Sequence, residues 1–366
     1  MPGSSAVFVG ASIAIGVVTI AYIRRRRRPS APANIIVAAC DLDKTMYPPA
    51  GPDQARQLAL NVAAMVRFEK TGGFVFPVTG NNPPQAQVKF LDPNGKPLRD
   101  VSKHPGIFCN GGLVLGPGGV ELERHALGKL LLRTSGVDVV TALLDFWHSP
   151  AQRALVEKIG LLFFFPDVLA GYDEAYEHVD AFCASQRVTP VRRGRAELVA
   201  GGKRVLQIVL LFPPLVEGAQ YEDEVKPWQL RVRGAMEAAG LADCAGGGAS
   251  GIKFTPMKDP WPEMDLCVGG VDKGSALSRF LQRAEVCSYL GVRSVEPASH
   301  LAVFGDAAND VPMFRAVCGV SPALRVAMPH SGHEDLLALA NVRAEVSEVL
   351  SQCCEARAAA NIQGEV

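Results

Sequence analysis

The feature that most restricts the fold of this chain is a set of short apolar runs that alternate with helical patterns. Residues Asn34 to Cys40 (NIIVAAC) are apolar at nearly every position, as in a strand that is buried on both faces. Residues 52–69 carry apolar side chains at helical spacing, and residues 74–78 form a second apolar run. A strand, a helix and a strand in this order predict parallel pairing through a right-handed crossover. We therefore expect an α/β fold with a parallel sheet.

The alternation is interrupted in the middle of the chain and then resumes. Residues 105–115 indicate two short strands around the turn Asn110-Gly111-Gly112. Beyond them the sequence predicts helices at 123–134, 138–148 and 227–239, with strand-like runs at 161–165 and 205–212. Apolar runs followed by helical patterns return from Leu301 onward. Because 366 residues allow two domains at roughly 150 residues each, we interpret the middle segment as an inserted α/β unit.

These patterns predict domain boundaries. We expect the core in two parts, residues 34–115 and 258–352, with the inserted domain at 116–257 between them. The Ala-rich segment 353–366 is expected to be a C-terminal tail that frays.

The N-terminal segment has the pattern of a membrane anchor. Residues 6–23 carry no charge over eighteen positions, and a helix of that length spans about 27 Å, enough to cross the hydrocarbon layer. Five arginines, residues 24–28, follow directly, whereas a cleavable signal peptide carries its positive charge first. We therefore expect a single transmembrane helix and basic flank at 1–28, a linker at 29–33 and a body facing the cytosol. A cleaved organelle-targeting segment is the competing interpretation.

Composition excludes several classes of protein. Lysine plus arginine and aspartate plus glutamate both total 37, and without the five N-terminal arginines 32 cationic residues face 37 acidic ones. A mildly acidic body lacks the basic surface that holds nucleic acid. The nine cysteines show no CxxC pair and indicate reduced thiols rather than a disulfide frame. His330 and His333 lack a third ligand, so a polar loop or helix start is favoured over a metal site.

Polar clusters follow three of the apolar runs at the point where each run ends. Asp41-Leu42-Asp43-Lys44-Thr45 follows the first, Thr79-Gly80 the second, and Gly305-Asp306-Ala307-Ala308-Asn309-Asp310 the run that starts at Leu301. The carboxyl ends of parallel strands meet at one edge of the sheet, which is where ligands bind in such folds. The three clusters together therefore predict one site.

Clustered carboxylates suit phosphoryl transfer. Their oxygen atoms hold a hard divalent cation, which neutralises phosphate charge. One aspartate is then free to attack phosphorus, and a neighbouring acid protonates the leaving oxygen and later deprotonates water. Lys273, at a predicted helix start, could add a fixed positive charge beside the phosphate, although a solvated helix-end lysine is the commoner case.

The order of these motifs resembles that of the haloacid-dehalogenase-like (HAD) hydrolase superfamily over about residues 34–350. The motifs are Asp41-x-Asp43-x-Thr45, Thr79-Gly80, Lys273 and Gly305-Asp306-x-x-Asn309-Asp310. The turn at Asn110-Gly111-Gly112 and the long insertion are similar to the Cof-type branch of phosphatases. The resemblance implies a Rossmann-like parallel core and an inserted α/β cap of the C2 type that closes over a small phosphorylated metabolite.

The resemblance also implies roles for individual residues. Asp41 would be the nucleophile and a Mg²⁺ ligand, Asp43 the general acid/base that also offers its backbone carbonyl to the metal, and Asp306 the remaining metal ligand. Thr79 would bind phosphoryl oxygens and Lys273 would steady the charge on Asp41. Substrate contacts are expected from Gly80, Asn81, Lys273 and Asn309. Thr45 and Asp310 would support the site.

The sequence departs from the family pattern at two positions. Lys44 stands where many relatives have glycine, and Asn81 stands where arginine is frequent. Asn81 removes an expected phosphate or substrate contact and therefore leaves the substrate open, with a sugar phosphate ahead of a phosphorylated cofactor.

Two further functions stay open beside a magnesium-dependent phosphatase. The first is a membrane-tethered scaffold that binds without turnover, and the second is a phosphomutase, which uses the same nucleophile. The intact pair Asp41 and Asp43 favours an enzyme, because a scaffold has no need of the second acid. Oligomeric state is not indicated.

Three other patterns suggest chemistry that we do not assign. Residues 246–251 match GxGxxG, but no strand precedes them, so a flexible loop is favoured over a dinucleotide site. Residues 163–165 and Trp261 could stack on a substrate ring, although aromatic residues in strand-like runs usually belong to the core. Cys40 ends a buried strand without an evident histidine partner and is not expected to be a nucleophile.

Overall fold

The computed structural model describes most of the chain from residue 34 onward. The described ranges are 34–91, 95–172, 176–216, 220–246, 249–258, 261–296, 300–318 and 323–364. The predicted anchor, basic flank and linker at 1–33 lie outside them. Within the described ranges, no helix has both the length and the apolar character needed to span a membrane.

The core is a five-stranded sheet in which all neighbouring strands are parallel, in the order β17-β16-β15-β1-β2. The strands are β1 (Val37–Cys40), β2 (Phe74–Pro77), β15 (Leu301–Gly305), β16 (Leu324–Ala327) and β17 (Val342–Arg343). The first predicted strand, β1, pairs with both β2 and β15. Strand β1 is therefore an inner strand, and its carboxyl-terminal end has a neighbouring strand on each side. The predicted parallel α/β core is confirmed.

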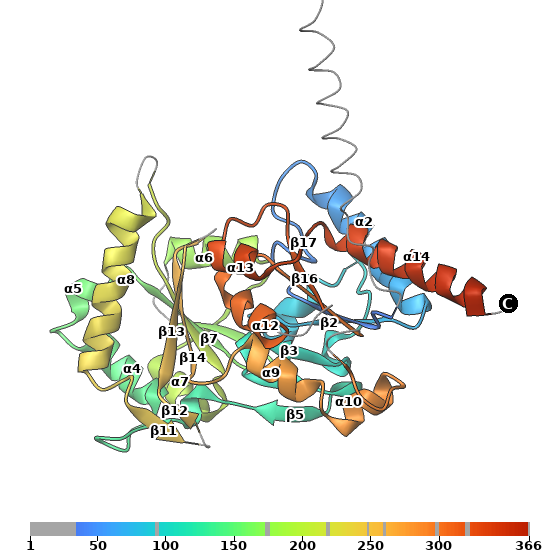
Figure 1. Cartoon of the computed structure of the whole chain (residues 1–366). Coiled ribbons are helices and arrows are strands. Elements are labelled where there is room, and N and C mark those ends of the chain that lie inside the picture. The colour runs from blue at the N-terminus through green and yellow to red at the C-terminus, as the bar shows by residue number, and fades with distance from the viewer. Residues whose placement is uncertain are drawn as a thin grey trace, which may run out of the picture.

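Helices cover both faces of this sheet, which explains why β1 is apolar at every position. Ala38 and Cys40 contribute to the cluster that contains α2 (Gln54–Lys70) and α14 (Val346–Gly364) side chains. Val37 and Ala39 face the opposite cluster, which contains side chains of four other helices. These are α9 (Lys273–Phe280), α10 (Ala284–Tyr289), α12 (Val311–Ala316) and α13 (Glu334–Leu339). Successive strand residues point to opposite faces, so both sets must be apolar. Figure 1 shows α2 and α14 side by side next to the core sheet.

A hairpin leads from the core toward the inserted domain. It consists of β3 (Gly106–Phe108) and β4 (Leu113–Leu115), and β5 (Glu121–Arg124) pairs with β4. The expected turn at Asn110-Gly111 is present as a 3-10 helix over Cys109–Gly111. A short helix, α3 (Pro83–Gln87), follows β2 within the core.

The helix predicted at 123–134 is wrong. This segment instead contains β5, a 3-10 turn at Leu127–Lys129 and β6 (Leu131–Leu132). Pairing of β5 with β4 overrides the apolar spacing. Gly128 also interrupts the segment, and a Cβ there would lie 1.8 Å from the carbonyl oxygen of Gly202, so this stretch of chain packs backbone against backbone.

The inserted domain is built on a six-stranded sheet in the order β13-β14-β10-β7-β8-β9, antiparallel except at β8–β9. Its strands are β7 (Gly160–Phe164), β8 (Leu169–Tyr172), β9 (Val191–Arg193), β10 (Gln207–Leu211), β13 (Ile252–Met257) and β14 (Glu263–Val268). A second, three-stranded sheet joins β6 to β11 (Cys244–Gly246) and β12 (Ala249–Ser250). These sheets and their helices form the inserted domain, which lies beside the core on the left of Figure 1.

Helices pack on both faces of the six-stranded sheet. Side chains of α4 (Val139–His148), α5 (Arg153–Val156), α7 (Arg195–Gly201) and α8 (Tyr221–Ala238) share one cluster with Phe163, Ile208 and Leu210. Side chains of α6 (Glu177–Ser185) pack on the other face, with Phe164 and Val209. The second face is the one that also approaches the core.

Two predicted boundaries need correction. The sequence analysis ended the inserted domain at residue 257, but β14 lies between β13 and β10 in its sheet, so the boundary falls after Val268. The segment from residue 353 is not a frayed tail over its described part, because α14 continues to Gly364 and Cys353 and Cys354 are buried. The alanines that suggested fraying are good helix formers, and the contact with α2 stabilises the helix.

The contact between α14 and the core depends on Arg357. Its guanidinium donates hydrogen bonds to the backbone carbonyl oxygens of Thr71 and Ile35 and lies over the ring of Phe68. We expect Arg357→Ala to lower the free energy of unfolding by about 1–2 kcal/mol, because two carbonyls lose a charged donor. Arg56→Ala, at an exposed position on α2, serves as the control and should change stability by less than about 0.5 kcal/mol. Urea denaturation measures both, and equal midpoints would contradict the ordered contact.

Candidate active site

Asp41 occupies the first position after the inner strand β1. Its backbone N–H donates to the carbonyl oxygen of Phe304, which continues the pairing with β15 by one residue. The chain then turns sharply, and the N–H of Met46 returns to the carbonyl oxygen of Asp41. Lys44 adopts a φ of 54° within this turn. That left-handed conformation favours glycine, and a side chain there costs about 1 kcal/mol, so the departure at Lys44 is tolerated at a small cost.

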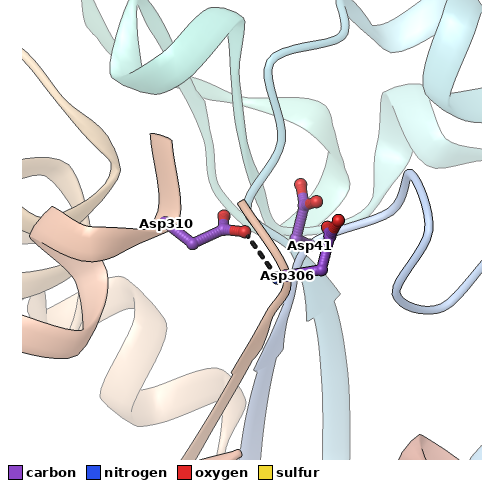
Figure 2. Close-up of side chains that lie close together, drawn as sticks. All are labelled: Asp41, Asp306 and Asp310. Atoms are coloured by element: carbon purple, nitrogen blue, oxygen red, sulfur yellow. Dashed lines mark hydrogen bonds between the residues drawn. The ribbon is translucent and has the colours of Figure 1, made fainter. Parts of the chain in front are cut away.

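Three carboxylates meet at this edge of the sheet. Single oxygen atoms of Asp41, Asp306 and Asp310 all lie within 4.8 Å of one another (Figure 2). The Nζ atom of Lys273 lies 2.6 Å from Asp41 Oδ1 and 2.6 Å from Asp310 Oδ1, and the lysine side chain is fully buried. Burial and the charge of Asp310 raise the pKa of Asp41, and Lys273 opposes that shift. The ammonium of Lys273 thus pairs with two of the acids, and its charge also opposes the rise in the pKa of the third, Asp306.

Asp310 also holds the loop that follows β15. Its Oδ2 accepts hydrogen bonds from the backbone N–H groups of Asp306 at 2.9 Å and Ala307 at 3.1 Å, and its Oδ1 is occupied by Lys273. Figure 2 shows the carboxylate reaching toward the end of the strand that carries Asp306. A Cβ on Gly305 would lie 2.6 Å from this carboxylate, so only glycine is accommodated there. Asp310 thus contacts both Lys273 and the loop that carries Asp306, and its supporting role stays a prediction.

The acids suit a hard divalent cation. Burial, and after it the charge of Asp310, raise the pKa of Asp306 to about 7. The carboxylates of Asp41 and Asp306 retain free oxygen atoms, while Thr45 Oγ1 donates to Asp306 Oδ1 at 3.3 Å. An all-oxygen donor set of this kind matches Mg²⁺. His330 Nε2 lies 4.0 Å from Asp306 Oδ2, but among the described residues the group that could hold a metal ion contains neither His330 nor His333.

Asp43 stands apart from the three-carboxylate cluster. Its carboxylate forms an ion pair with Lys89 and accepts a hydrogen bond from Asn81 Nδ2 at 2.6 Å. Burial raises the pKa of Asp43, but Lys89 and Asn81 outweigh that effect and hold the pKa below its usual value. Asn81 therefore binds the proposed acid/base directly.

Lys89 is a residue that the sequence analysis missed. Its side chain is 3% exposed, and Nζ also donates to Asn81 Oδ1 at 3.2 Å and to Gln186 Oε1 of the inserted domain at 2.7 Å. It follows α3 in the stretch Gln87-Val88-Lys89-Phe90, which carries no recognisable motif. A lysine in such a position is usually solvated, so no sequence signal could have identified it.

Thr79 and Lys273 are buried behind the pocket wall, whereas Gly80, Asn81 and Asn309 line the pocket. Thr79 Oγ1 accepts two hydrogen bonds from Asn81, one from its backbone N–H at 3.2 Å and one from its side-chain Nδ2 at 2.9 Å. The hydroxyl hydrogen of Thr79 remains available as a donor. Asn309 Nδ2 lies 3.4 Å from Asn110 Oδ1, which connects the last motif to the β3–β4 turn.

The pocket is open to solvent and is lined by residues of both domains. The core contributes mainly charged and amide side chains: Asp41, Asp43, Lys44, Asn81, Asp306 and Asn309. The inserted domain contributes three aromatic rings, two amides, two acids and two apolar side chains: Phe164, Phe182, Trp261, Gln186, Gln207, Glu263, Asp265, Val209 and Met257. None of the residues from the inserted domain except Phe164 and Trp261 was singled out from the sequence.

Other sequence patterns have clear outcomes. Cys40 is buried in the core, and burial raises the pKa of its thiol well above the usual value. Gly246 and Ser250 lie in the antiparallel pair β11–β12, which lacks the strand-to-helix geometry of a dinucleotide site. Phe163 and Phe165 are core residues as expected, but Phe164 and Trp261 line the pocket.

Comparison with known proteins identifies solved structures with a similar fold. No protein-family model matches the chain, and no curated protein matches it in sequence. A protein described as a HAD/COF-like hydrolase from Plasmodium vivax superposes with a TM-score of 0.60 at 13% identity, covering 88% of this chain and 96% of that chain. The HAD subclass IIB sugar phosphatase BT4131 gives 0.55 at 17%, covering 89% and 99%. BT1666 from Bacteroides thetaiotaomicron, a HAD phosphatase, gives 0.52 at 15%, covering 88% and 95%.

The chain therefore has the fold of the HAD superfamily phosphatases, including its HAD/COF-like members. The order of the motifs predicted this fold, and the prediction is confirmed. The alignments extend over nearly the whole of each relative and over 88–89% of this chain, so they include the inserted domain.

Asp265 provides a test of the electrostatics of the site. Burial raises its pKa from 3.8 to about 6, although Gln207 and Asn110 hydrogen-bond its carboxylate. A carboxyl whose pKa is higher in the folded state favours folding less as the pH rises from about 4 to 7, because the unfolded state ionises first. We expect Asp265→Asn to be more stable than the unchanged protein at pH 7.5, by about 2 kcal/mol, with a smaller gain at pH 4.5.

Thermal unfolding in EDTA at both pH values measures this difference. Asp223→Asn, at an exposed position on α8, is the matched control and should shift the melting temperature equally at the two pH values. If Asp265→Asn raised the melting temperature equally at pH 4.5 and pH 7.5, the pKa of the Asp265 carboxyl would not be raised by folding.

Proposed function

We propose that this protein is a magnesium-dependent phosphatase that hydrolyses a small phosphorylated metabolite through an aspartyl phosphate. The observation that carries the proposal is the position of Asp41. It ends an inner strand, lines an open pocket, and has a buried lysine on one side and the acid of Asp306 on the other. Such an arrangement supplies a nucleophile and a place for phosphate charge.

In the first step, a carboxylate oxygen of Asp41 attacks phosphorus and the bond from phosphorus to the ester oxygen breaks. Asp43 gives a proton to the departing oxygen, and because its carboxylate is ion-paired with Lys89 in the structure, it must take up that proton before this step. In the second step, water attacks the phosphorus of the aspartyl phosphate, Asp43 takes a proton from that water, and inorganic phosphate leaves with Asp41 restored. Bound Mg²⁺, held by Asp41, Asp306 and the backbone carbonyl of Asp43, would neutralise phosphoryl charge.

Other residues prepare these steps. Lys273 steadies the charge on Asp41, and the free hydroxyl hydrogen of Thr79 is available to a phosphoryl oxygen. Gly80, Asn81 and Asn309 line the pocket and would contact the substrate. The inserted domain would act as the cap that covers the pocket and excludes bulk water.

A sugar phosphate remains the favoured substrate, ahead of a phosphorylated cofactor. The pocket combines aromatic rings with acids and amides, and one fold relative, BT4131, is a sugar phosphatase. A non-catalytic scaffold and a phosphomutase remain the alternatives. The mutase would pass the phosphoryl group to a second hydroxyl rather than to water.

We expect the full-length protein to release phosphate from a panel of sugar phosphates and phosphorylated cofactors in the presence of Mg²⁺ and not in EDTA. Asp41→Asn should lower the rate at least about 10³-fold, because an amide cannot accept the phosphoryl group. Phosphate assays measure both, with Cys40→Ala as the control, because Cys40 is the adjacent residue and points into the core. Magnesium-independent release that survives Asp41→Asn would contradict the mechanism. Binding without release favours the scaffold, and transfer between hydroxyls favours the mutase.

We also propose that residues 6–23 anchor the chain in a membrane with the catalytic body in the cytosol. The support is the uncharged run followed by Arg24 to Arg28. We expect the full-length chain to stay with membranes after carbonate extraction and the chain without residues 1–28 to stay in the supernatant. Protease added to intact cells should leave the body uncut. A full-length chain in the supernatant, or a smaller mature protein of cleaved-leader size, would contradict the anchor.

A further inference from the structure

The inserted domain forms one wall of the pocket, which we call the roof, and strand β14 carries two carboxylates there. Glu263 and Asp265 lie two residues apart on β14, so both side chains point to the same face of the inserted sheet. That face approaches the core, because Asn110 of the β3–β4 turn donates to Asp265 Oδ2 at 3.0 Å. Both acids line the pocket that also contains Asp41.

Neither acid has a cationic partner within ion-pair distance among the described residues. Lys89 is paired with Asp43, and Lys273 is paired with Asp41 and Asp310. Asp265 accepts hydrogen bonds only from neutral amides, those of Asn110 and Gln207, and the carboxylate of Glu263 forms none within the described ranges. Burial raises the pKa of Glu263 well above its usual value, and Asp265 raises it further.

Besides Glu263, another acceptor in the same pocket lacks a hydrogen-bond donor among the described residues. Asn309 lines the pocket, and its Oδ1 is buried without a hydrogen-bond partner in the described structure. A buried acceptor without a donor costs about 1–3 kcal/mol, so a ligand that brings N–H groups would relieve it. The pocket thus has unused acceptors on both of its walls.

Acids outnumber lysines around the pocket, even when a bound metal ion and the phosphate of the substrate are included in the count. Near Asp41, three lysines face four aspartates: Lys44, Lys89 and Lys273 against Asp41, Asp43, Asp306 and Asp310. A divalent cation and a doubly charged phosphate would cancel each other there. Lys273, and Lys253 on β13, act on Asp265, and Lys89 and Lys44 act on Glu263, without forming an ion pair with either acid. Around the pocket, four lysines therefore face six acids.

Aromatic rings border the two acids. Phe182 and Trp261 pack edge to face with ring centroids 6.1 Å apart, and both line the pocket with Phe164. Aromatic faces attract cations and also cover the carbon skeleton of a ligand. Acids beside aromatic rings therefore favour a ligand group that is cationic and attached to an apolar or ring skeleton.

We propose that the substrate is a phosphomonoester whose alcohol part carries a protonated amine, bound between Glu263 and Asp265, as in an amino sugar phosphate. The ammonium donates N–H groups to the two carboxylates while the phosphoryl group lies at Asp41. The carbon skeleton rests against Trp261 and Phe164. This inference rests on the proposed phosphatase function and specifies its substrate class.

The test compares substrates that differ only in the amine. We expect kcat/KM at pH 7 for glucosamine 6-phosphate to exceed those for glucose 6-phosphate and N-acetylglucosamine 6-phosphate by about 10-fold or more, since a charge-assisted hydrogen bond contributes about 1.5–3 kcal/mol. The double variant Glu263→Gln, Asp265→Asn should bring the three values within about threefold of one another. Asp223→Asn, an exposed acid of the same domain, is the control and should keep the full preference.

A binding measurement separates this inference from the catalytic proposal. Calorimetry with Asp41→Asn, Mg²⁺ and each sugar phosphate reports recognition without turnover, so it decides the matter even if no phosphate is released. Tighter binding of glucosamine 6-phosphate that disappears in the added double variant supports the amine site. Equal or tighter binding of glucose 6-phosphate, or a preference that survives the double variant, overturns it.

Discussion

The buried ammonium of Lys273 is the interaction on which the candidate site depends. Its Nζ lies 2.6 Å from carboxylate oxygens of Asp41 and Asp310, and no part of its side chain is exposed. Taking a charge out of water costs several kcal/mol, so this lysine is stable only with its partners in place. The end of β1, the start of α9 and the turn after β15 must therefore meet at one point. The same contact keeps Asp41 at the pocket.

Polar contacts between the two domains complete the site. Asn82 Nδ2 donates to the carbonyl oxygens of Phe165 and Val168 at 3.0 Å each, Lys89 reaches Gln186, and Asn110 reaches Asp265. These contacts place the roof over the acids of the core. The inserted domain thus adds residues that would recognise a substrate to the core residues that would bind it and transfer its phosphoryl group. A change in the spacing of the two domains would therefore change binding and chemistry together.

The core and its acids could be predicted because their signals are local. A run that is apolar on both faces indicates a covered parallel strand, and the residue after it must lie at the carboxyl edge of the sheet. Asp41, Asp306 and Asp310 follow from this rule. The helix expected at 123–134 failed because β5 finds a partner in β4, which apolar spacing does not reveal. The end of the inserted domain was missed because β14 resembles any other buried strand until its neighbours are known.

The amino-acid sequence by itself determined the parallel core, the existence of an inserted domain and the aspartates at the strand ends, because each depends on residues next to one another along the chain. Only the tertiary structure decided which residues join them. Lys89 meets Asp43 across 46 positions, and Asn110 meets Asp265 across 155. Such contacts depend on sheet order and on the direction in which each side chain points. A one-residue shift of β14 would turn Glu263 and Asp265 away from the pocket, because alternate residues of a strand face opposite sides.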